Sequence, residues 1–231
     1  MKKRTFRHDG LILGLSLLLA SGFARAQEAE VDDLVQKLKG QVGKPGAGGL
    51  ATRGLKTRSL NAGGVASAPV KETRSLLLSR GVPAAVSAAA EEDKVALKPS
   101  GGDAVELSYE VDPKSEVSKD NIFFRKGTAE FADDHSVAEV VTLADALKHP
   151  ELRGLKYVIE GHASAEGDDY GNLALSQERA ERIVSVLTRL GVEPERLVPV
   201  GFGESQARFD AHEGEALLKQ DRRVLIFRLD R

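Results

Sequence analysis

The chain has 231 residues, of which 41% are hydrophobic and 29% are charged, so it can build one good core with tails or two small domains. Its 33 basic and 35 acidic residues give a net charge of -2, which argues against nucleic acid or an anionic membrane surface as the main partner. The sequence contains no cysteine, which excludes disulfides, thiolate metal sites, a cysteine nucleophile and a cysteine that carries a lipid.

Residues 1–26 have the pattern of a cleaved signal peptide. Basic residues gather in 2–7, an apolar run follows in 11–20, and 24–26 read Ala-Arg-Ala, a small-residue cleavage site. The alternative is a membrane anchor, but a spanning helix needs about 20 apolar residues, roughly twice the length of this run. No later stretch approaches that length, so we expect no transmembrane segment. We therefore expect a mature chain that starts at Gln27 and is exported to the periplasm.

The segment 27–41 is expected to form a short amphipathic helix. Its apolar residues recur at spacings of three and four, with acids early and lysines late, as a helix dipole favours. These apolar residues are Val31, Leu34, Val35 and Leu38. Two interpretations stay open: a helix for partner binding or self-association, or a frayed helix exposed to solvent. The marginal stability of so short a helix favours the second.

Residues 42–104 are expected to be a flexible, basic linker, since most of this stretch is rich in Gly, Ala and Ser and poor in aromatic residues. A unit of the form Thr-Arg-Gly/Ser-Leu recurs at 52–55, 57–60 and 73–76. The repeats are either docking points for an acidic partner or wall polymer, or parts of a weakly basic tether, and the composition favours the tether. Through residues 27–100 the chain is expected to reach an outer-membrane or other envelope protein.

Regular structure is expected over residues 105–231. Strict alternation of apolar and polar residues predicts a strand at 105–111, which Asp112-Pro113 should end. Further strands are predicted at 121–124, 156–160, 196–200 and 223–227. Helices are predicted from a cap at Asp133 or Asp134 to Leu147, from Leu173 to Leu190 with Gly191 as cap, and at 213–219.

From residue 121 onward the order is β-α-β-α-β-α-β. This order predicts an α/β fold of the α+β sandwich type, with a small mixed sheet of four strands and the helices on one face. Single helices between strands favour parallel neighbours joined by right-handed crossovers.

Four blocks of residues in this region have a characteristic order and spacing. They are Gly161-His162-Ala163-Ser164-Ala165-Glu166-Gly167, then Asn172 with Leu175-Ser176-Gln177-Glu178-Arg179-Ala180, then Gly201-Phe202-Gly203-Glu204, and last Asp221-Arg222-Arg223-Val224. Together they resemble the OmpA-like C-terminal domain family, shared with Pal and MotB. The family pattern is Gly-His-Thr-Asp, then Tyr-Asn, Leu-Ser and Arg-Ala, later Gly-Tyr-Gly-Glu and Asn-Arg-Arg-Val. The resemblance covers about 121–229 and implies this fold, peptidoglycan binding and no catalysis.

The resemblance implies a ligand site built from Arg179, Ser164, Glu166, Asn172 and Arg222. Its ligand would be the diaminopimelate of the peptidoglycan stem peptide, a zwitterion that needs a cation for its carboxylate and an acceptor for its ammonium. Arg179, expected in the second turn of its helix, can hold a carboxylate through two parallel hydrogen bonds; the alternative is a surface arginine that pairs with neighbouring glutamates. Asn172 either binds ligand amides or caps its helix.

For the basic pair at positions 222 and 223, two assignments stay open. Either Arg222 or Arg223 faces the pocket, while the other supports the strand end.

This sequence departs from the family at the expected ammonium acceptor. Ser164 stands in place of the motif's Asp, and Ala163 in place of Thr. Because hydrogen bonds to a charge contribute about 1.5 to 3 kcal/mol against about 1 kcal/mol for neutral pairs, a loss of about tenfold in affinity is expected. The carboxylate of Glu166, two residues on, can fill the vacancy. Leu218 stands where many relatives of the resembled family carry another arginine, so that this site lacks one cationic side chain that theirs contain.

Enzymatic interpretations have little support. His162 and Ser164 are two residues apart on one loop and form no triad, and no Gly-x-Ser-x-Gly motif occurs. The histidines lack metal-ligand spacing, and we expect His162 to anchor its loop. The sequence thus predicts a periplasmic, non-catalytic peptidoglycan-binding protein without a cofactor. The alternative is a scaffold protein of an envelope complex, with the same fold and a degenerate pocket.

Overall fold

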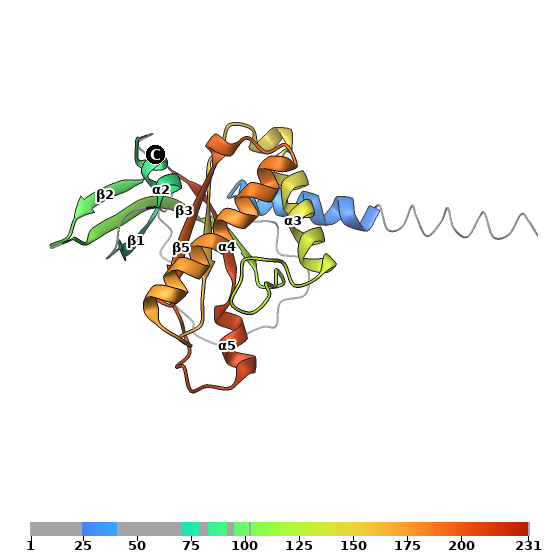
Figure 1. Cartoon of the computed structure of the whole chain (residues 1–231). Coiled ribbons are helices and arrows are strands. Elements are labelled where there is room, and N and C mark those ends of the chain that lie inside the picture. Colours follow the sequence, from blue (N-terminus) through green and yellow to red (C-terminus); the bar gives the residue numbers. More distant parts are fainter. Residues whose placement is uncertain (1–24, 41–70, 79–82, 92–94, 102, 231) are drawn as a thin grey trace, which may run out of the picture.

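The computed structural model describes residues 25–40, 71–78, 83–91, 95–101 and 103–230. Its described residues form a curled six-stranded sheet with the order β1-β3-β6-β4-β5, and β2 also pairs with β3 (Figure 1). The strands are β1 (Glu72–Leu78), β2 (Ala96–Pro99), β3 (Val105–Lys119), β4 (Tyr157–His162), β5 (Leu197–Gly203) and β6 (Val224–Leu229). The helices are α2 (Ala84–Glu91), α3 (Asp134–Leu147), α4 (Asp169–Arg189) and α5 (Glu215–Asp221), preceded by an N-terminal helix seen over residues 25–38.

The mixed α/β class is confirmed, although the sheet has more strands than the four predicted. The segment predicted as a signal peptide lies, but for its last two residues, outside the described part. Within the described residues no helix has the length and apolar character that crossing a bilayer requires.

Among the strands of the described residues, parallel pairing is confined to β4 and β5, and every other strand pair is antiparallel. The prediction of parallel neighbours was therefore wrong for β6. Strand β6 lies between β3 and β4 and runs antiparallel to both. The reason lies in the position of α5 at the end of the sheet where β4 and β5 end and β6 begins, so that this helix does not carry the chain back along the sheet. The chain returns through β6 in the opposite direction.

The first strand of the predicted domain is longer than expected, and the second is absent. β3 continues past Asp112 and Pro113 to Lys119, with a shift of register between Asp112 and Val117 that accommodates the proline. The hydroxyl of Ser115, inside this irregularity, accepts a hydrogen bond from the backbone N–H of Arg228 at 2.7 Å. Residues 121–124 form no strand and contribute only an isolated bridge, Phe124 to Phe131.

Helices α3 and α4 cover one face of the sheet, as predicted. The side chain of Asp133 caps α3 by accepting from the N–H of Ser136, and Gly191 follows α4 with a positive φ of 94°. Their buried residues pack on alternate residues of the central strands. This core includes Leu143, Leu147, Ile183 and Leu187 from the helices and Tyr157, Ile159, Val224 and Ile226 from the strands.

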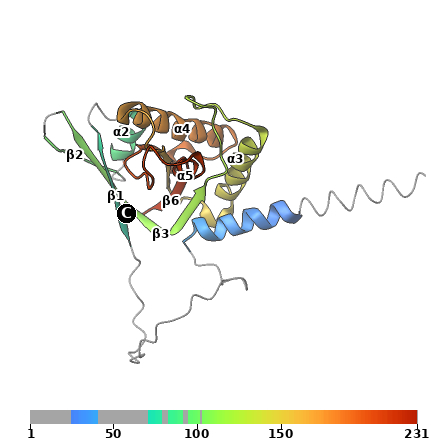
Figure 2. The same cartoon turned by 90° about the horizontal axis from the view of Figure 1, so that it is seen from below.

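The N-terminal helix belongs to the same core. Leu34, Val35 and Leu38 are at most 5% exposed, and the helix lies beside α3 (Figure 2). Its carboxyl end is held by two side chains of the sheet: Tyr157 Oη donates to Leu38 O at 3.5 Å, and Arg228 Nη1 donates to Lys39 O at 2.5 Å. The favoured interpretation of a frayed, exposed helix was therefore wrong, because the apolar stripe packs on the chain's own core.

The second face of the sheet is covered by a part of the predicted linker. β1 and α2 supply Leu76, Leu78, Val86 and Ala89, which pack with Phe202, Phe227 and other residues of the central strands. The linker prediction was thus wrong for residues 72–78, 84–91 and 96–99, while 41–70 lie outside the described residues. Alternation of inward-facing residues marks β1, but the Gly, Ala and Ser content around it concealed the pattern. The helices therefore do not all lie on one face.

Candidate functional site

A cavity of about 290 Å³ opens where α4, α5, the ends of β4 and β6, and the segment after β3 meet. Its lining carries four cationic side chains, one carboxylate and two phenylalanine rings. These are Arg179, Lys219, Arg222, Arg223, Glu215, Phe123 and Phe124. Such a lining favours an anionic ligand with some apolar surface.

Arg179 points into this cavity from α4. Its Nε donates to the backbone oxygen of Thr128 at 3.0 Å, and its guanidinium lies 5.1 Å from the centre of the Phe124 ring. Among the described residues no carboxylate pairs with it, so the alternative of a surface arginine paired with its glutamate neighbours is not what the structure contains. Burial, with a smaller contribution from the charge of Arg222, lowers the pKa of Arg179 from its ordinary value.

The helix that carries Arg179 starts earlier than predicted. Helix α4 begins at Asp169 rather than Leu173, so Arg179 is its eleventh residue and lies beyond the second turn. Because the effect of a helix dipole is confined to the first turn, the partly positive helix end does not act on this side chain. Arg179 therefore depends on its own charge and on the cavity around it.

Residues of the sequence motifs fix α4 against the sheet. Ser176 Oγ accepts from the N–H of Gly203 at 2.8 Å, and Gln177 Oε1 accepts from the N–H of Gly201 at 2.7 Å. A Cβ atom placed on Gly161 or Gly201 would lie 2.3 Å from the helix backbone, at Ser176 O or Gln177 N. Only glycine permits this approach, which places Arg179 beside the β4 loop.

Ser164, Glu166 and Arg222 meet at the loop that follows β4. Ser164 is 4% exposed, and its hydroxyl lies 3.4 Å from both Glu166 Oε2 and Arg222 Nη1. Arg222 Nη1 also lies 3.3 Å from Glu166 Oε2, and its Nη2 pairs with Glu215. The Glu166 carboxylate thus lies next to the serine that replaces the family's acid, although neither residue is among those that line the cavity, and its role as ammonium acceptor stays a prediction. Arg222, which lines the cavity, joins this loop to α5.

Asn172 holds the loop and does not line the cavity. Its Nδ2 donates to the backbone oxygens of Ser164 at 3.3 Å and Glu166 at 2.9 Å, and to the carboxylate of Glu204. The cap of α4 is Asp168, which accepts from the N–H of Gly171, so the capping alternative for Asn172 was wrong. A contact between Asn172 and ligand amides stays a prediction.

Arg222 and Arg223 have different surroundings, although both line the cavity. Arg223 Nη1 donates to the backbone oxygen of Asp221 at 3.2 Å and to its carboxylate at 3.4 Å. Burial and the charge of Arg208 lower the pKa of Arg223. Arg223 therefore supports the start of β6, and Arg222 reaches the loop with Ser164.

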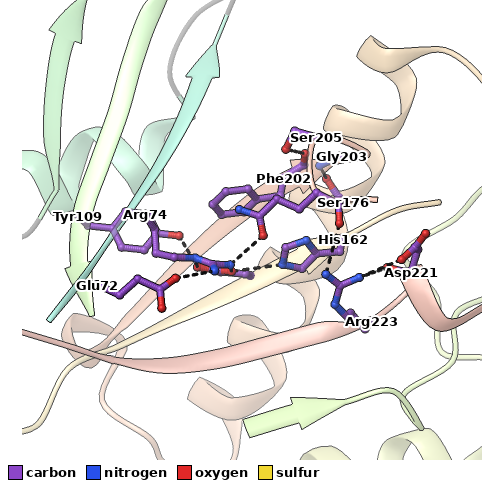
Figure 3. A network of polar contacts seen from close by, with 12 residues as sticks. Glu72, Arg74, Tyr109, His162, Ser176, Phe202, Gly203, Ser205, Asp221 and Arg223 are labelled. Carbon is purple, nitrogen blue, oxygen red and sulfur yellow. Dashed lines mark hydrogen bonds and ion pairs between the residues drawn. The ribbon is translucent and has the colours of Figure 1, made fainter. Parts of the chain in front are cut away.

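A buried polar network lies beneath this loop (Figure 3). Glu160 of β4 is fully buried and accepts from Arg74 of β1 at 3.1 and 2.5 Å and from Tyr109 Oη at 2.6 Å. His162 Nε2 lies 3.2 Å from the same carboxylate. Burial alone would raise the pKa of Glu160, but the hydrogen bonds from His162 and Arg74 bring it below its ordinary value.

His162 lines the cavity, but its side-chain hydrogen bond is to the carboxylate of this buried network. Its ring stacks on Phe202 with centres 5.2 Å apart, and burial lowers its pKa below the ordinary value against the opposing effect of Glu160. The predicted role of His162 in anchoring its loop is consistent with these contacts.

Sequence reasoning missed three parts of the cavity: Lys219, Glu215 and the Phe123-Phe124 pair. Lys219 Nζ lies 4.3 Å from the centre of the Phe123 ring. The available signal was the position of Lys219, which directly follows Leu218, where the family resemblance led us to expect a cation. The phenylalanines were assigned to a strand instead.

Comparison with known proteins agrees with this architecture. Residues 123–219 match the model of the OmpA family, and this stretch is an OmpA family domain. It is similar to outer membrane porin F of Pseudomonas fluorescens, with 38% identity over 72 residues that make up 31% of this chain and 22% of the porin. It is also similar to the peptidoglycan-associated lipoprotein of Pasteurella multocida, with 32% identity over 72 residues, 31% of this chain and 48% of that protein. The matches thus span less than half the length of these relatives.

Two solved structures have a similar arrangement. One is the peptidoglycan-associated lipoprotein from Burkholderia pseudomallei, with 28% identity and a TM-score of 0.40, covering 48% of this chain and 88% of that one. The other is the cell wall anchor of the T6SS from Pseudomonas aeruginosa, with 20% identity and a TM-score of 0.42, covering 64% of this chain and 95% of that one.

Proposed function

We propose that the OmpA family domain binds peptidoglycan non-covalently through the cavity around Arg179, and that the protein does no catalysis. The observation that carries this proposal is the guanidinium of Arg179, which lines a cationic cavity and has no carboxylate partner among the described residues. The family match and the similarity to a peptidoglycan-associated lipoprotein support it.

The ligand we propose is the diaminopimelate of the stem peptide. Its carboxylate binds the two terminal nitrogens of Arg179, which can donate two parallel hydrogen bonds. Its ammonium binds Glu166, whose side chain is 50% exposed and lies beside Ser164. Arg222 positions the Glu166 carboxylate, and Asn172 holds the backbone of the same loop.

We further propose that a signal peptide, residues 1–26, exports the chain to the periplasm of a Gram-negative cell. There the domain keeps the protein at the wall. Residues 27–100 contact another envelope protein with the surfaces that the N-terminal helix, β1 and β2 do not bury.

Co-sedimentation with purified sacculi tests the proposed function. The mature chain should pellet with sacculi, and Arg179→Ala should weaken binding at least tenfold, because a charge-assisted contact to the ligand is lost. The matched control is Arg182→Ala, which removes an exposed arginine less than one turn away on the same helix. Equal pelleting of Arg179→Ala and wild type would refute the site.

A second candidate is a scaffold protein of an envelope complex whose pocket no longer binds the wall. It is favoured by Ser164 at the acceptor position and by the pairing of Arg222 with two glutamates of the chain itself. Ser164→Asp restores the family's carboxylate. If wild type stays in the supernatant while Ser164→Asp pellets, the scaffold function replaces wall binding.

A further inference from the structure

Two cations in the cavity lack an acidic partner among the residues that the structure describes. Arg179 and Lys219 lie over the rings of two consecutive residues, Phe124 and Phe123, at 5.1 and 4.3 Å from the ring centres. Among the described residues neither cation forms an ion pair. Each is held at the cavity wall by an aromatic face, a contact that orients a cation without neutralising it.

The other two cations of the cavity are paired. Arg222 contacts the carboxylates of Glu166 and Glu215, and Arg223 contacts that of Asp221, which Arg208 also contacts. The carboxylates near the cavity are therefore already engaged by arginines. The charge that remains for a ligand to neutralise is that of Arg179 and Lys219.

Resting on the proposed function, we propose that this cavity selects a ligand with two carboxylates, one bound by Arg179 and the other by Lys219. A ligand with a single carboxylate would neutralise one cation and leave the other facing it in a partly enclosed site. Stem peptides offer a suitable pair, since the γ-linked glutamate carries a free carboxylate besides the side-chain carboxylate of diaminopimelate. Lys219 is then the residue that determines specificity for the free glutamate carboxylate.

The two cations suit different parts of such a ligand. The guanidinium of Arg179 is planar and partly buried, so it can fix the orientation of one carboxylate through paired hydrogen bonds. Lys219 is exposed, and its ammonium is a compact charge on a flexible stem that can follow a second carboxylate over several positions. Arg179 therefore fixes the orientation of the bound ligand, and Lys219 binds its second carboxylate.

The experiment measures the affinity of two synthetic stem tripeptides that contain diaminopimelate and end in a C-terminal amide, so that the diaminopimelate residue keeps only its side-chain carboxylate. One has the glutamate carboxylate free, and the other has it amidated. Wild type should bind the free peptide about tenfold more tightly, because a charge-assisted contact is replaced by a neutral one. In Lys219→Met, which keeps an apolar stem over Phe123, the free peptide should lose about the same factor, and the two peptides should bind equally.

The matched control is Lys98→Met, since Lys98 is an exposed lysine on β2 that does not line this cavity. It should bind as wild type does. The inference is overturned if amidation changes the wild-type affinity less than twofold, or if Lys219→Met still discriminates the two peptides. Wild type that binds sacculi and both peptides equally overturns this inference alone, whereas wild type that binds none of them overturns the proposed function as well.

Discussion

The protein contains two clusters of arginines and acids that differ in how completely the charges are paired. In the buried cluster Arg74 is matched to Glu160, and Tyr109 and His162 occupy the remaining acceptor positions of the carboxylate (Figure 3). In the cavity the arginines 222 and 223 are paired, while Arg179 and Lys219 form no ion pair with any residue that the structure describes. The same residue types are thus fully paired in one place and only partly paired in the other.

The two clusters differ in their access to solvent and in how completely their charges are paired. A fully buried carboxylate must be satisfied by the protein, because water cannot reach it. A cation at an open cavity can remain solvated until a ligand arrives. Removing one partner should therefore affect stability in the first cluster and binding in the second.

The largest effect on stability is expected from substitution of Arg74. Arg74→Met should lower the free energy of unfolding by about 3 to 5 kcal/mol, because it leaves Glu160 as a buried charge without its main partner. Urea denaturation at neutral pH measures the change. The control is Arg125→Met, which removes an ion pair with both side chains about two-thirds exposed and should cost less than about 1 kcal/mol. Equal effects of the two substitutions would contradict the assigned role of Arg74.

Two neighbouring leucines of β1 test whether this strand is a part of the core. Leu76→Ala should destabilise by about 2 to 4 kcal/mol, since Leu76 is 7% exposed and packs in the second core. Leu77→Ala should change the stability by less than about 0.5 kcal/mol, because Leu77 is 54% exposed. If both variants unfold at the wild-type urea concentration, β1 does not dock on the sheet.

The smallest effect concerns pH and His162. Burial keeps the pKa of His162 below its ordinary value in the folded state, so the unfolded chain takes up a proton first as pH falls through about 6.5. Stability should therefore decrease between pH 7.5 and 5.5. In His162→Gln this contribution disappears and the slope becomes shallower. Urea midpoints at the two pH values measure it, and identical slopes in the two proteins would exclude the effect.

The sequence was sufficient for the elements whose signal is local. The Asp133 cap, the apolar stripe of α4 and Gly191 all predicted structure from neighbouring residues, and the spacing of the motifs identified the family. Arg179 was selected by the same spacing, and it lines the cavity, while its role as a ligand residue stays a prediction. These signals come from residues within a few turns of one another, so they can be recognised without knowledge of the tertiary packing.

The parts that failed depend on contacts distant in sequence. Arg74 reads as one cation of a basic linker until Glu160, 86 residues later, is placed opposite it. The Thr-Arg-Ser-Leu unit at 73–76 then appears as a strand with Arg74 and Leu76 facing inward, and not as a docking repeat. Lys219 was likewise missed, because its place in the cavity follows from the packing of α5 and not from any local pattern.

The glycines at positions 161 and 201 leave little freedom in where helix α4, and with it Arg179, can lie. At these two points helix α4 touches the sheet backbone to backbone, with no side chain between them that could change its rotamer to absorb an error. A single added methyl group at either position has to move the whole helix, and Arg179 with it. The core around this helix can accept the exchange of one apolar residue for another, whereas positions 161 and 201 accept no side chain without a displacement of α4.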